Sequence, residues 1–186
     1  MNRKFLFVLG SGRRNGNTKI LARKAAENLP LSVEQQWLNL MDLPLAPFED
    51  IRHDVGVYPQ PISNEKTLFD ATLWATDLVF VCPLYWYSVS ASTKLYLDYW
   101  SAWLRVPDAQ FKARMAGKTA WAISVSSSED ETESEEVSAP LVHCLRLSAD
   151  YMRMDWGGVL LGRGNRTGDV LKDEAALEKA KSFFKV

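Results

Sequence analysis

A short glycine loop between an apolar strand and a helix, almost at the N-terminus, is the feature that most restricts the fold of this chain. The apolar run at residues 5–9 predicts a strand, residues 10–18 form a polar loop with three glycines, and helical spacing starts at Lys19. A continuous apolar run suits a strand that is buried on both faces, as in a parallel sheet. The start of the chain therefore favours an α/β fold.

Strand and helix patterns alternate along the rest of the chain. The predicted strands cover Lys4–Leu9 and residues 33–38, 77–82, 118–125 and 154–161. The predicted helices cover residues 19–28, 64–75, 91–104, 137–151 and 169–184, with Ser63 or Asn64 as the N-cap of the second. Five strands alternating with five helices predict a parallel sheet that is covered on both faces and has right-handed crossovers.

The loops that follow the first, third and fourth strands are expected to meet. In open parallel sheets, ligands bind at the carboxyl ends of the strands, where the strand order reverses. Residues 10–18, the segment from Pro83 onward and the segment from Ser124 onward all lie at such ends. We therefore expect these three loops to form one binding site.

The first loop is suited to binding a phosphate. Glycines let the backbone approach closely, and the N-terminus of the following helix adds roughly half a positive charge. The loop has no lysine after Gly16, which a P-loop requires, and Asn15 stands where a dinucleotide fingerprint needs its third glycine. The alternative is a polar turn without a ligand. The candidate phosphate ligands are the side chains of Ser11, Asn15, Asn17 and Thr18, with a cation from Arg13 or Arg14.

The second loop carries three consecutive aromatic residues, Tyr85, Trp86 and Tyr87, directly after a buried strand. Such side chains suit a flat, partly apolar ligand, because rings can stack on it or contact its edge. The alternative is that they pack in the core or against another subunit. The serine-rich third loop, residues 124–128, can offer hydroxyl and backbone N–H groups to the ligand's polar edge, or can be an ordinary turn.

The composition excludes several other classes of protein. A length of 186 residues suits one domain, and we expect a single domain over residues 1–186. A net charge of −1 does not indicate binding to nucleic acid or to an anionic membrane, and no apolar run approaches the roughly 18 residues of a membrane span. The run at residues 5–9 is too short for a signal peptide. Two cysteines form no disulfide framework, so we expect a cytoplasmic protein.

The histidines and cysteines form neither a catalytic nor a metal-binding pattern. His53 and His143 are the only histidines, and both fall outside the three loops. Cys82 lies in a central strand just before Pro83, so burial is the expectation for its thiol. No cluster of His, Cys, Asp or Glu has metal-ligand spacing. We therefore expect no metal and no catalytic side chain.

Two segments resemble the signatures of the NADPH-dependent FMN reductase family. GSGRRNGNTKIL, after the first strand, is similar to the phosphate loop of that family, and PLYWYSVSASTKLYLDYW is similar to its second signature. The second signature combines a proline, an aromatic-rich loop and a helix with Lys94 and Asp98 four residues apart. The resemblance covers residues 3–165. It implies a flavodoxin-like three-layer sandwich whose five-stranded parallel sheet has the order 2-1-3-4-5.

The resemblance also implies a cofactor, its contacts and a reaction. The FMN phosphate would be bound by Ser11, Arg13, Asn17 and Thr18. The isoalloxazine ring would be bordered by Pro83, Leu84, Tyr85 and Trp86, with Ser88 in the same signature. Ser126 would approach the pyrimidine side of the flavin or its ribityl chain. In the implied reaction NAD(P)H reduces FMN, and the reduced flavin reduces a small-molecule electron acceptor. That acceptor would be a quinone, an azo or nitro compound, or free flavin.

The chain departs from the family pattern at several positions. Residues 39–76 contain no cysteine, so we expect no iron–sulfur cluster of the kind that one branch of the family carries. Ser90 and Tyr99 stand where the family commonly has Pro and Arg, which leaves the subfamily open. Two other functions also stay open, namely a flavodoxin-type electron carrier and a non-catalytic FMN- or phosphate-binding module.

Three further patterns have two readings each. Aromatic residues recur on one face of the third helix, at Tyr96, Tyr99, Trp100 and Trp103, and either pack in the core or form the contact of a homodimer or homotetramer. The acidic run at residues 129–136 either docks a basic redox partner or is a solvated loop that favours the next helix. The polar stretch at residues 39–60 is longer than most connections and is expected to be functional or to cover a site.

Overall fold

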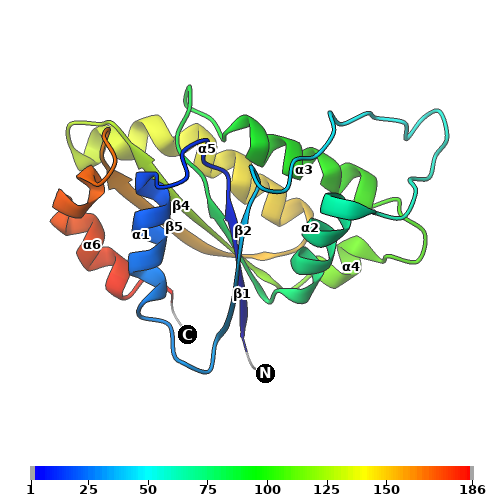
Figure 1. The fold of residues 1–186 in the computed structure, drawn as a ribbon, viewed down its shortest axis with the longest axis horizontal. Helices are drawn as coiled ribbons and strands as arrows, with labels where there is room; N and C mark the ends of the chain where they lie inside the picture. The colour runs from blue at the N-terminus through cyan, green and yellow to red at the C-terminus, as the bar shows by residue number, and fades with distance from the viewer. Residues whose placement is uncertain (1–2, 185–186) are drawn as a thin grey trace.

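The computed structural model describes residues 3–184 as a five-stranded sheet with helices on both faces (Figure 1). The strands are β1 (Lys4–Leu9), β2 (Glu34–Asn39), β3 (Asp77–Val81), β4 (Thr119–Ser126) and β5 (Asp155–Arg163). All neighbouring strands are parallel, and their order is β2-β1-β3-β4-β5. The predicted flavodoxin-like architecture and strand order are therefore confirmed.

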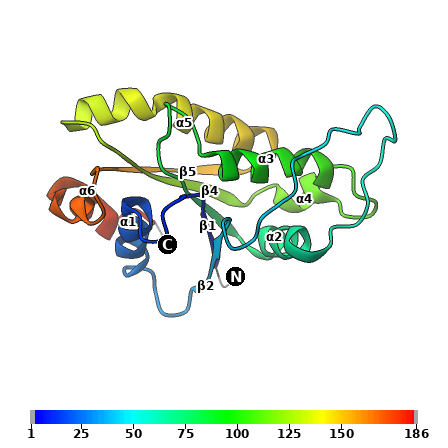
Figure 2. The same cartoon turned by 45° about the horizontal axis from the view of Figure 1, so that its top comes forward.

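The helices lie in two layers, one on each side of the sheet. They are α1 (Asn17–Ala26), α2 (Ser63–Trp74), α3 (Ala91–Trp103), α4 (Phe111–Met115), α5 (Glu131–Tyr151) and α6 (Glu174–Lys181), with a 3₁₀ turn, η1, at Asp169–Lys172. Figure 2 shows α3 and α5 on the face opposite to α1 and α6. The side chains of β1 alternate accordingly, because Leu6 and Val8 pack with the α2, α3 and α5 layer while Phe5 and Phe7 pack with the α1 and α6 layer.

Several boundaries differ from the sequence-based expectation. Helix α5 begins at Glu131 rather than at residue 137, because the Asp130 side chain caps it by accepting the N–H of Glu133. The final helix is divided into η1 and α6, and α4 was not anticipated. Neither Ser63 nor Asn64 caps α2, because Ile62 occupies the N-cap and the Asn64 amide donates to the Pro44 carbonyl.

The aromatic residues of α3 form core rather than a homodimer contact. Tyr96, Trp100 and Trp103 are at most 4% exposed and pack edge-on against one another and against Phe111. Tyr99 is only partly buried, and its hydroxyl donates to the Ala46 carbonyl. The hypothesis that this helix face joins two subunits is therefore wrong.

The long connection after β2 packs on the far side of α3 from the strand ends. Phe48 stacks with Tyr58 and meets Tyr99 edge-on, and the Tyr58 hydroxyl binds the backbone of Ile51. In Figure 1 this segment extends beyond α2 and α3, away from α1. Most of this connection therefore covers the end of the α3 layer, while Asp42, near its start, pairs with Arg14 of the loop after β1. No helix within residues 3–184 is long and apolar enough to cross a membrane.

Candidate functional site

The loops after β1, β3 and β4 converge on one cavity, as expected. The cavity has a volume of about 130 Å³ and also receives residues from the loop after β5. Its lining residues are Ser11, Arg13, Gly16, Asn17, Thr18, Pro83, Leu84, Tyr85, Val125, Ser126, Ser127, Gly164 and Asn165. We refer to it as the β1 cavity, since the glycine loop after β1 forms one wall.

The start of α1 presents unpaired donors to the β1 cavity. Gly16 is the N-cap, so no side chain caps the helix, whereas Ser90, Asp130 and Asp173 cap α3, α5 and α6. Thr18, in the first turn, is 2% exposed, and its Oγ1 has no hydrogen-bond partner. Because an unpaired buried hydroxyl is costly and helix N-termini attract anions, this wall fits a phosphate.

Ser11 and Arg13 keep their positions through contacts within and across the loops. Ser11 is buried at the wall of the cavity, and its Oγ accepts the Arg13 N–H at 3.1 Å. The Arg13 guanidinium donates to the Asn165 carbonyl, across the cavity from the glycine loop. Gly10 is required where the loop leaves β1, because a Cβ there would overlap Thr93 Oγ1 in α3.

Asn17 lines the β1 cavity, and both atoms of its amide bond to another loop. Its Nδ2 donates to the Arg166 carbonyl at 2.9 Å, and its Oδ1 accepts the Gly168 N–H at 2.8 Å. The side chain therefore clamps the loop after β5 to the start of α1. Asn15 does not reach the β1 cavity and lines a separate one beside β2 together with Arg14.

The loop after β5 is the part of the site that the sequence did not indicate. Gly164 and Asn165 line the β1 cavity. A Cβ on Gly164 would lie 2.8 Å from the Val170 backbone nitrogen and 2.9 Å from Asn17 Nδ2, so only glycine fits there. The signal in the sequence was Gly164, three residues after the end of the fifth predicted strand, which lies next to the fourth in the sheet.

A second cavity of about 270 Å³ adjoins the first and shares Leu84, Ser126 and Ser127 with it. We call it the aromatic cavity, because Trp86 and Tyr87 form one of its walls. Its other lining residues are Ser128, Glu133 and Val137, the last two from α5. Of the aromatic loop, Pro83, Leu84 and Tyr85 therefore face the β1 cavity, while Leu84, Trp86 and Tyr87 face the aromatic cavity.

A tight turn places the aromatic side chains. Tyr85 and Ser88 exchange backbone hydrogen bonds at 3.1 Å, and both residues between them have left-handed backbones, with φ of +50° at Trp86 and +60° at Tyr87. This is a two-residue hairpin of the type that normally requires Asn and Gly. Ser88 closes the turn through its backbone and lines neither cavity.

The serines of the third loop connect β4 to α5. Ser126 Oγ lies 3.0 Å from Ser134 Oγ and 2.7 Å from Ser128 Oγ, so its hydroxyl sits where the two cavities join. Ser124, expected in a loop, lies inside β4 and is fully buried. Of this segment, Ser126 and the residues after it are therefore available to a ligand.

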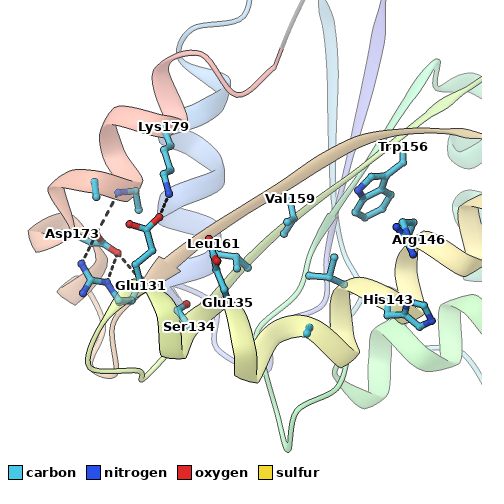
Figure 3. A pocket seen from close by; sticks show the side chains of 15 residues that line it. Glu131, Ser134, Glu135, His143, Arg146, Trp156, Val159, Leu161, Asp173 and Lys179 are labelled. Atoms are coloured by element: carbon cyan, nitrogen blue, oxygen red, sulfur yellow. Dashed lines mark hydrogen bonds and ion pairs between the residues drawn. The ribbon is translucent and has the colours of Figure 1, made fainter.

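A different cavity, of about 460 Å³, lies along the outer edge of β5 between α5 and α6 (Figure 3). Trp156, Val159 and Leu161 line it from the strand, and His143 and Arg146 stand at one end. It shares no lining residue with the β1 cavity or the aromatic cavity. It is therefore a groove on the sheet edge, separate from the converging loops.

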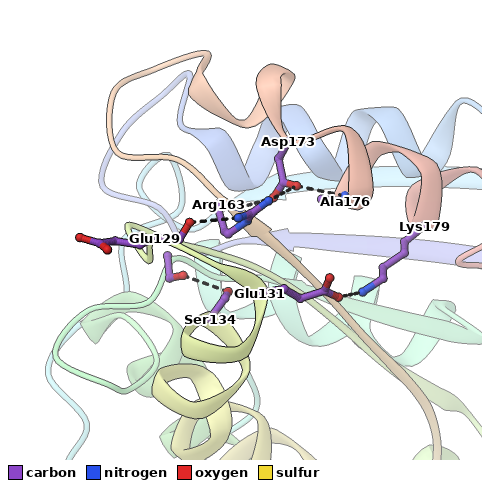
Figure 4. A network of polar contacts seen from close by, with 8 residues as sticks. Glu129, Glu131, Ser134, Arg163, Asp173, Ala176 and Lys179 are labelled. Carbon is purple, nitrogen blue, oxygen red and sulfur yellow. Dashed lines mark hydrogen bonds and ion pairs between the residues drawn. The ribbon is translucent and has the colours of Figure 1, made fainter.

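A polar network closes the carboxyl end of this edge (Figure 4). Arg163 binds both carboxylate oxygens of Asp173 and donates to the Glu129 carbonyl, while Lys179 pairs with Glu131. Burial acts to raise the pKa of Asp173, but the hydrogen bonds from Arg163 and from the Ala176 N–H, with the charge of Arg163, outweigh it and lower the pKa below its usual value. The network holds α5 and α6 against the end of β5.

Cys82 has a structural position, as expected. It is 1% exposed, its Sγ accepts the Ser90 N–H at 3.2 Å, and burial raises the pKa of its thiol. His53 and His143 are both exposed and lie outside the two cavities. Among residues 3–184, no group of three or more His, Cys, Asp or Glu side chains is arranged to hold a metal ion.

Comparison with known proteins agrees with this geometry. A model of the family described as NADPH-dependent FMN reductase matches residues 3–148. A Bacillus subtilis protein named NAD(P)H-dependent FMN-containing oxidoreductase YwqN is 32% identical over 183 residues, which cover 98% of this chain and 97% of that one.

Solved structures show the same fold. The Trp repressor binding protein from Bacillus subtilis has a TM-score of 0.75 at 28% identity, with 97% of each chain covered. An FMN-dependent NADH-azoreductase from Bacillus anthracis, solved in complex with FMN, has a TM-score of 0.61 at 12% identity, again with 97% of each chain covered. At that identity the second likeness concerns the fold alone.

Proposed function

The chain belongs to the NADPH-dependent FMN reductase family, and from this premise we propose that its FMN binds in the β1 cavity and the adjoining aromatic cavity. The protein is an FMN-dependent NAD(P)H oxidoreductase, so the predicted enzyme class and cofactor are confirmed over a carrier or a non-catalytic module. We propose which residues hold the cofactor and which class of molecule accepts the electrons.

The FMN phosphate belongs at the start of α1. The observation that carries this proposal is Thr18 Oγ1, which is buried and without a partner beside an uncapped helix N-terminus. A phosphate there would accept from that hydroxyl and from the first N–H groups of the helix, and would meet the Ser11 hydroxyl and the Arg13 cation. Asn17 would act through the loop it clamps, because its amide is already bonded.

The isoalloxazine ring belongs in the aromatic cavity. A cavity of about 130 Å³ is smaller than the roughly 300 Å³ at which pockets for organic ligands begin, so the cofactor must extend beyond the β1 cavity. The aromatic cavity shares a wall with it and offers Leu84, Trp86 and Tyr87 to a flat ring. Ser126 and Ser127, at the junction, would meet the ribityl chain or the polar edge of the ring.

The chemistry of hydride and electron transfer is supplied by FMN when it is bound. The side chains described here bind the phosphate, orient the ring and exclude water from the side that Leu84 and Val137 cover. No side chain is assigned a proton-transfer role. We propose that the acceptor is a quinone, an azo or nitro compound, or free flavin, all of which present a flat conjugated system to the aromatic wall.

We further propose that the protein is one domain that acts as a homodimer in the cytoplasm. Cys82 and Cys144 are both free, which suits a reducing compartment. Val55, Val57 and Ile62 are more than half exposed on the long connection after β2, and we propose that the second subunit covers them. Light scattering should give twice the 21.0 kDa mass of the chain. A monomer at micromolar concentration would contradict the homodimer.

Replacing Thr18 by valine tests the phosphate site directly. Thr18→Val removes the buried hydroxyl and keeps the shape, so FMN affinity should fall about 10- to 100-fold, because a hydrogen bond to a charged group is worth roughly 1.5–3 kcal/mol. The apoprotein should be as stable as wild type or more stable, since an unpaired buried hydroxyl costs roughly 1–3 kcal/mol. Fluorescence titration with FMN and urea unfolding measure the two effects.

The matched control is Ser138→Ala. Ser138 is also fully buried with an unpaired Oγ, but it lies on α5 and lines neither cavity. This variant should leave FMN affinity unchanged. An unchanged FMN affinity in Thr18→Val would contradict the phosphate site.

A further inference from the structure

Two exposed aromatic side chains border the opening of the aromatic cavity. Trp86 is 92% exposed and Tyr87 is 58% exposed, although both are held on a tight turn. Within the described residues 3–184, neither ring packs against another aromatic ring. Their faces are therefore free to stack on a flat molecule that approaches the cavity from solvent.

The described lining of the aromatic cavity carries a single charged group. Glu133, on the first turn of α5, is the only Asp, Glu, Lys, Arg or His among the described residues that line this cavity. One of its oxygens accepts the Glu129 N–H at 2.7 Å, and no cation is paired with it in the described part of the chain. Its negative charge therefore lies at the cavity lining without a paired cation.

The cations on neighbouring segments, Lys179, Arg163 and Arg13, are engaged elsewhere. Lys179 of α6 pairs with Glu131, which lies on the same turn of α5 as Glu133, and Arg163 pairs with Asp173. Arg13, in the β1 cavity, donates to the Asn165 carbonyl and faces the proposed phosphate. The only charge among the described residues of this lining is therefore negative, and a negative charge placed beside Glu133 would be repelled.

We propose that this opening selects the electron acceptor by shape and by charge. Trp86 stacks on the acceptor's ring, and Glu133 disfavours a negative charge on or beside that ring, so the reacting rings are planar, aromatic and uncharged or cationic. A phosphate that stays outside the opening, as in NAD(P)H or FMN, is not affected. The inference rests on the proposed function, because an acceptor must approach the flavin ring through this opening. It makes Trp86 and Glu133 specificity-determining residues of the known reaction.

Binding of three nearly isosteric ligands to the oxidised holoprotein tests the proposal without turnover. Benzamidine, benzamide and benzoate share one ring and carry a positive, a zero and a negative charge at neutral pH. Their dissociation constants are read from the change in flavin absorbance. We expect benzamidine to bind most tightly and benzoate most weakly, with steps of about threefold to fivefold at low salt, as for exposed charge pairs.

Variants separate the two determinants. Glu133→Gln should bring the three constants within about twofold of one another, while its remaining amide oxygen still accepts the Glu129 N–H. Glu136→Gln removes the same charge from an exposed position on α5 that does not line the cavity, and it should leave the order intact. Trp86→Leu should weaken all three ligands by a similar factor of about 3–10.

The outcomes distinguish this proposal from the one it rests on. Titration of the apoprotein with FMN comes first, and a chain that takes up no FMN overturns the proposed function together with this inference. A chain that takes up FMN but binds the three ligands equally overturns the selectivity alone. The same holds if Glu133→Gln keeps the order of the wild type.

Discussion

Two adjacent residues at the start of α1 show how differently similar side chains can be used. Asn17 and Thr18 are both polar, both buried and both on the wall of the β1 cavity. The amide of Asn17 bonds to Arg166 and Gly168, so it belongs to the framework of the site. The hydroxyl of Thr18 has no partner, so it is available to a ligand. Bonding, and not residue type, separates framework from ligand contact.

Replacing Asn17 should affect folding and binding together. Asn17→Ala leaves the Gly168 N–H and the Arg166 carbonyl without their partner, so the apoprotein should lose roughly 1–3 kcal/mol of unfolding free energy. FMN affinity should fall as well, because the loop that carries Gly164 and Asn165 is no longer fixed. Urea unfolding and FMN titration measure both. A loss of affinity with unchanged stability would instead make Asn17 a direct ligand.

Among the elements, the hairpin turn after β3 shows the clearest conflict between local preference and position. Bulky residues seldom adopt a left-handed backbone, and this turn has two in succession, Trp86 and Tyr87. Such strain costs of order 1–3 kcal/mol per residue and tends to occur at functional sites. Since Trp86 is almost fully exposed, packing within the chain does not repay that cost.

Replacing both turn residues by residues that favour a left-handed backbone should therefore stabilise the protein. The double variant Trp86→Asn, Tyr87→Gly places the preferred residues at both left-handed positions, and the apoprotein should gain about 1–3 kcal/mol in unfolding free energy. Chemical denaturation at equilibrium measures the gain, with an unchanged slope against denaturant as the sign that the fold is the same. A destabilised double variant would show that the aromatic rings contribute packing that their exposure does not reveal.

The start of α5 explains why the sequence predicted too late a start for this helix. Residues 131–136 carry no apolar spacing that would mark a helix, yet they form its first turns. The Asp130 side chain caps the helix by accepting the Glu133 N–H, and a carboxylate oxygen of Glu133 accepts the Glu129 N–H. Acidic residues near a helix N-terminus are stabilising, so these residues support the start of α5. Its docking to a basic protein partner stays untested.

For the whole molecule, the Arg163–Asp173 pair makes global stability depend on pH. Asp173 is 7% exposed and joins the end of the edge strand β5 to the first turn of α6. Burial opposes ionisation, but Arg163 outweighs it, so the pKa of Asp173 lies below its unfolded value. A lowered carboxyl pKa contributes stability that is full above the unfolded pKa, about 3.9, and is lost as pH falls through the folded value.

Asp173→Asn should thus be less stable than wild type at neutral pH, by roughly 1.5–3 kcal/mol. The difference should shrink as the pH falls below about 4, because protonation removes the same charge from the wild type. Denaturant unfolding at several pH values measures both proteins. Lys172→Gln, which removes an exposed pair with Asp169, serves as control and should change little. A gap that stays constant down to low pH would contradict this account.

Local pattern was sufficient for the architecture of the whole molecule. Apolar runs such as residues 5–9 are buried in the sheet whichever strands they neighbour, so the strands and most of the helices could be identified. The family resemblance then supplied the strand order. The glycine loop, Pro83 and Ser126 could also be placed at one site, because the carboxyl ends of parallel strands lie on one edge. These features depend on neighbours in sequence or on a general rule of the fold.

The sequence by itself thus determined the sheet, the three converging loops and the kind of cofactor they suit. Only the tertiary structure decided that Asn17 is a clamp, that Asn15 faces another cavity, that Gly164 joins the site and that Tyr96 is core. The physical reason is that hydrogen bonding and burial depend on which distant segments meet. A polar side chain is a ligand or a support according to whether the fold has already given it a partner.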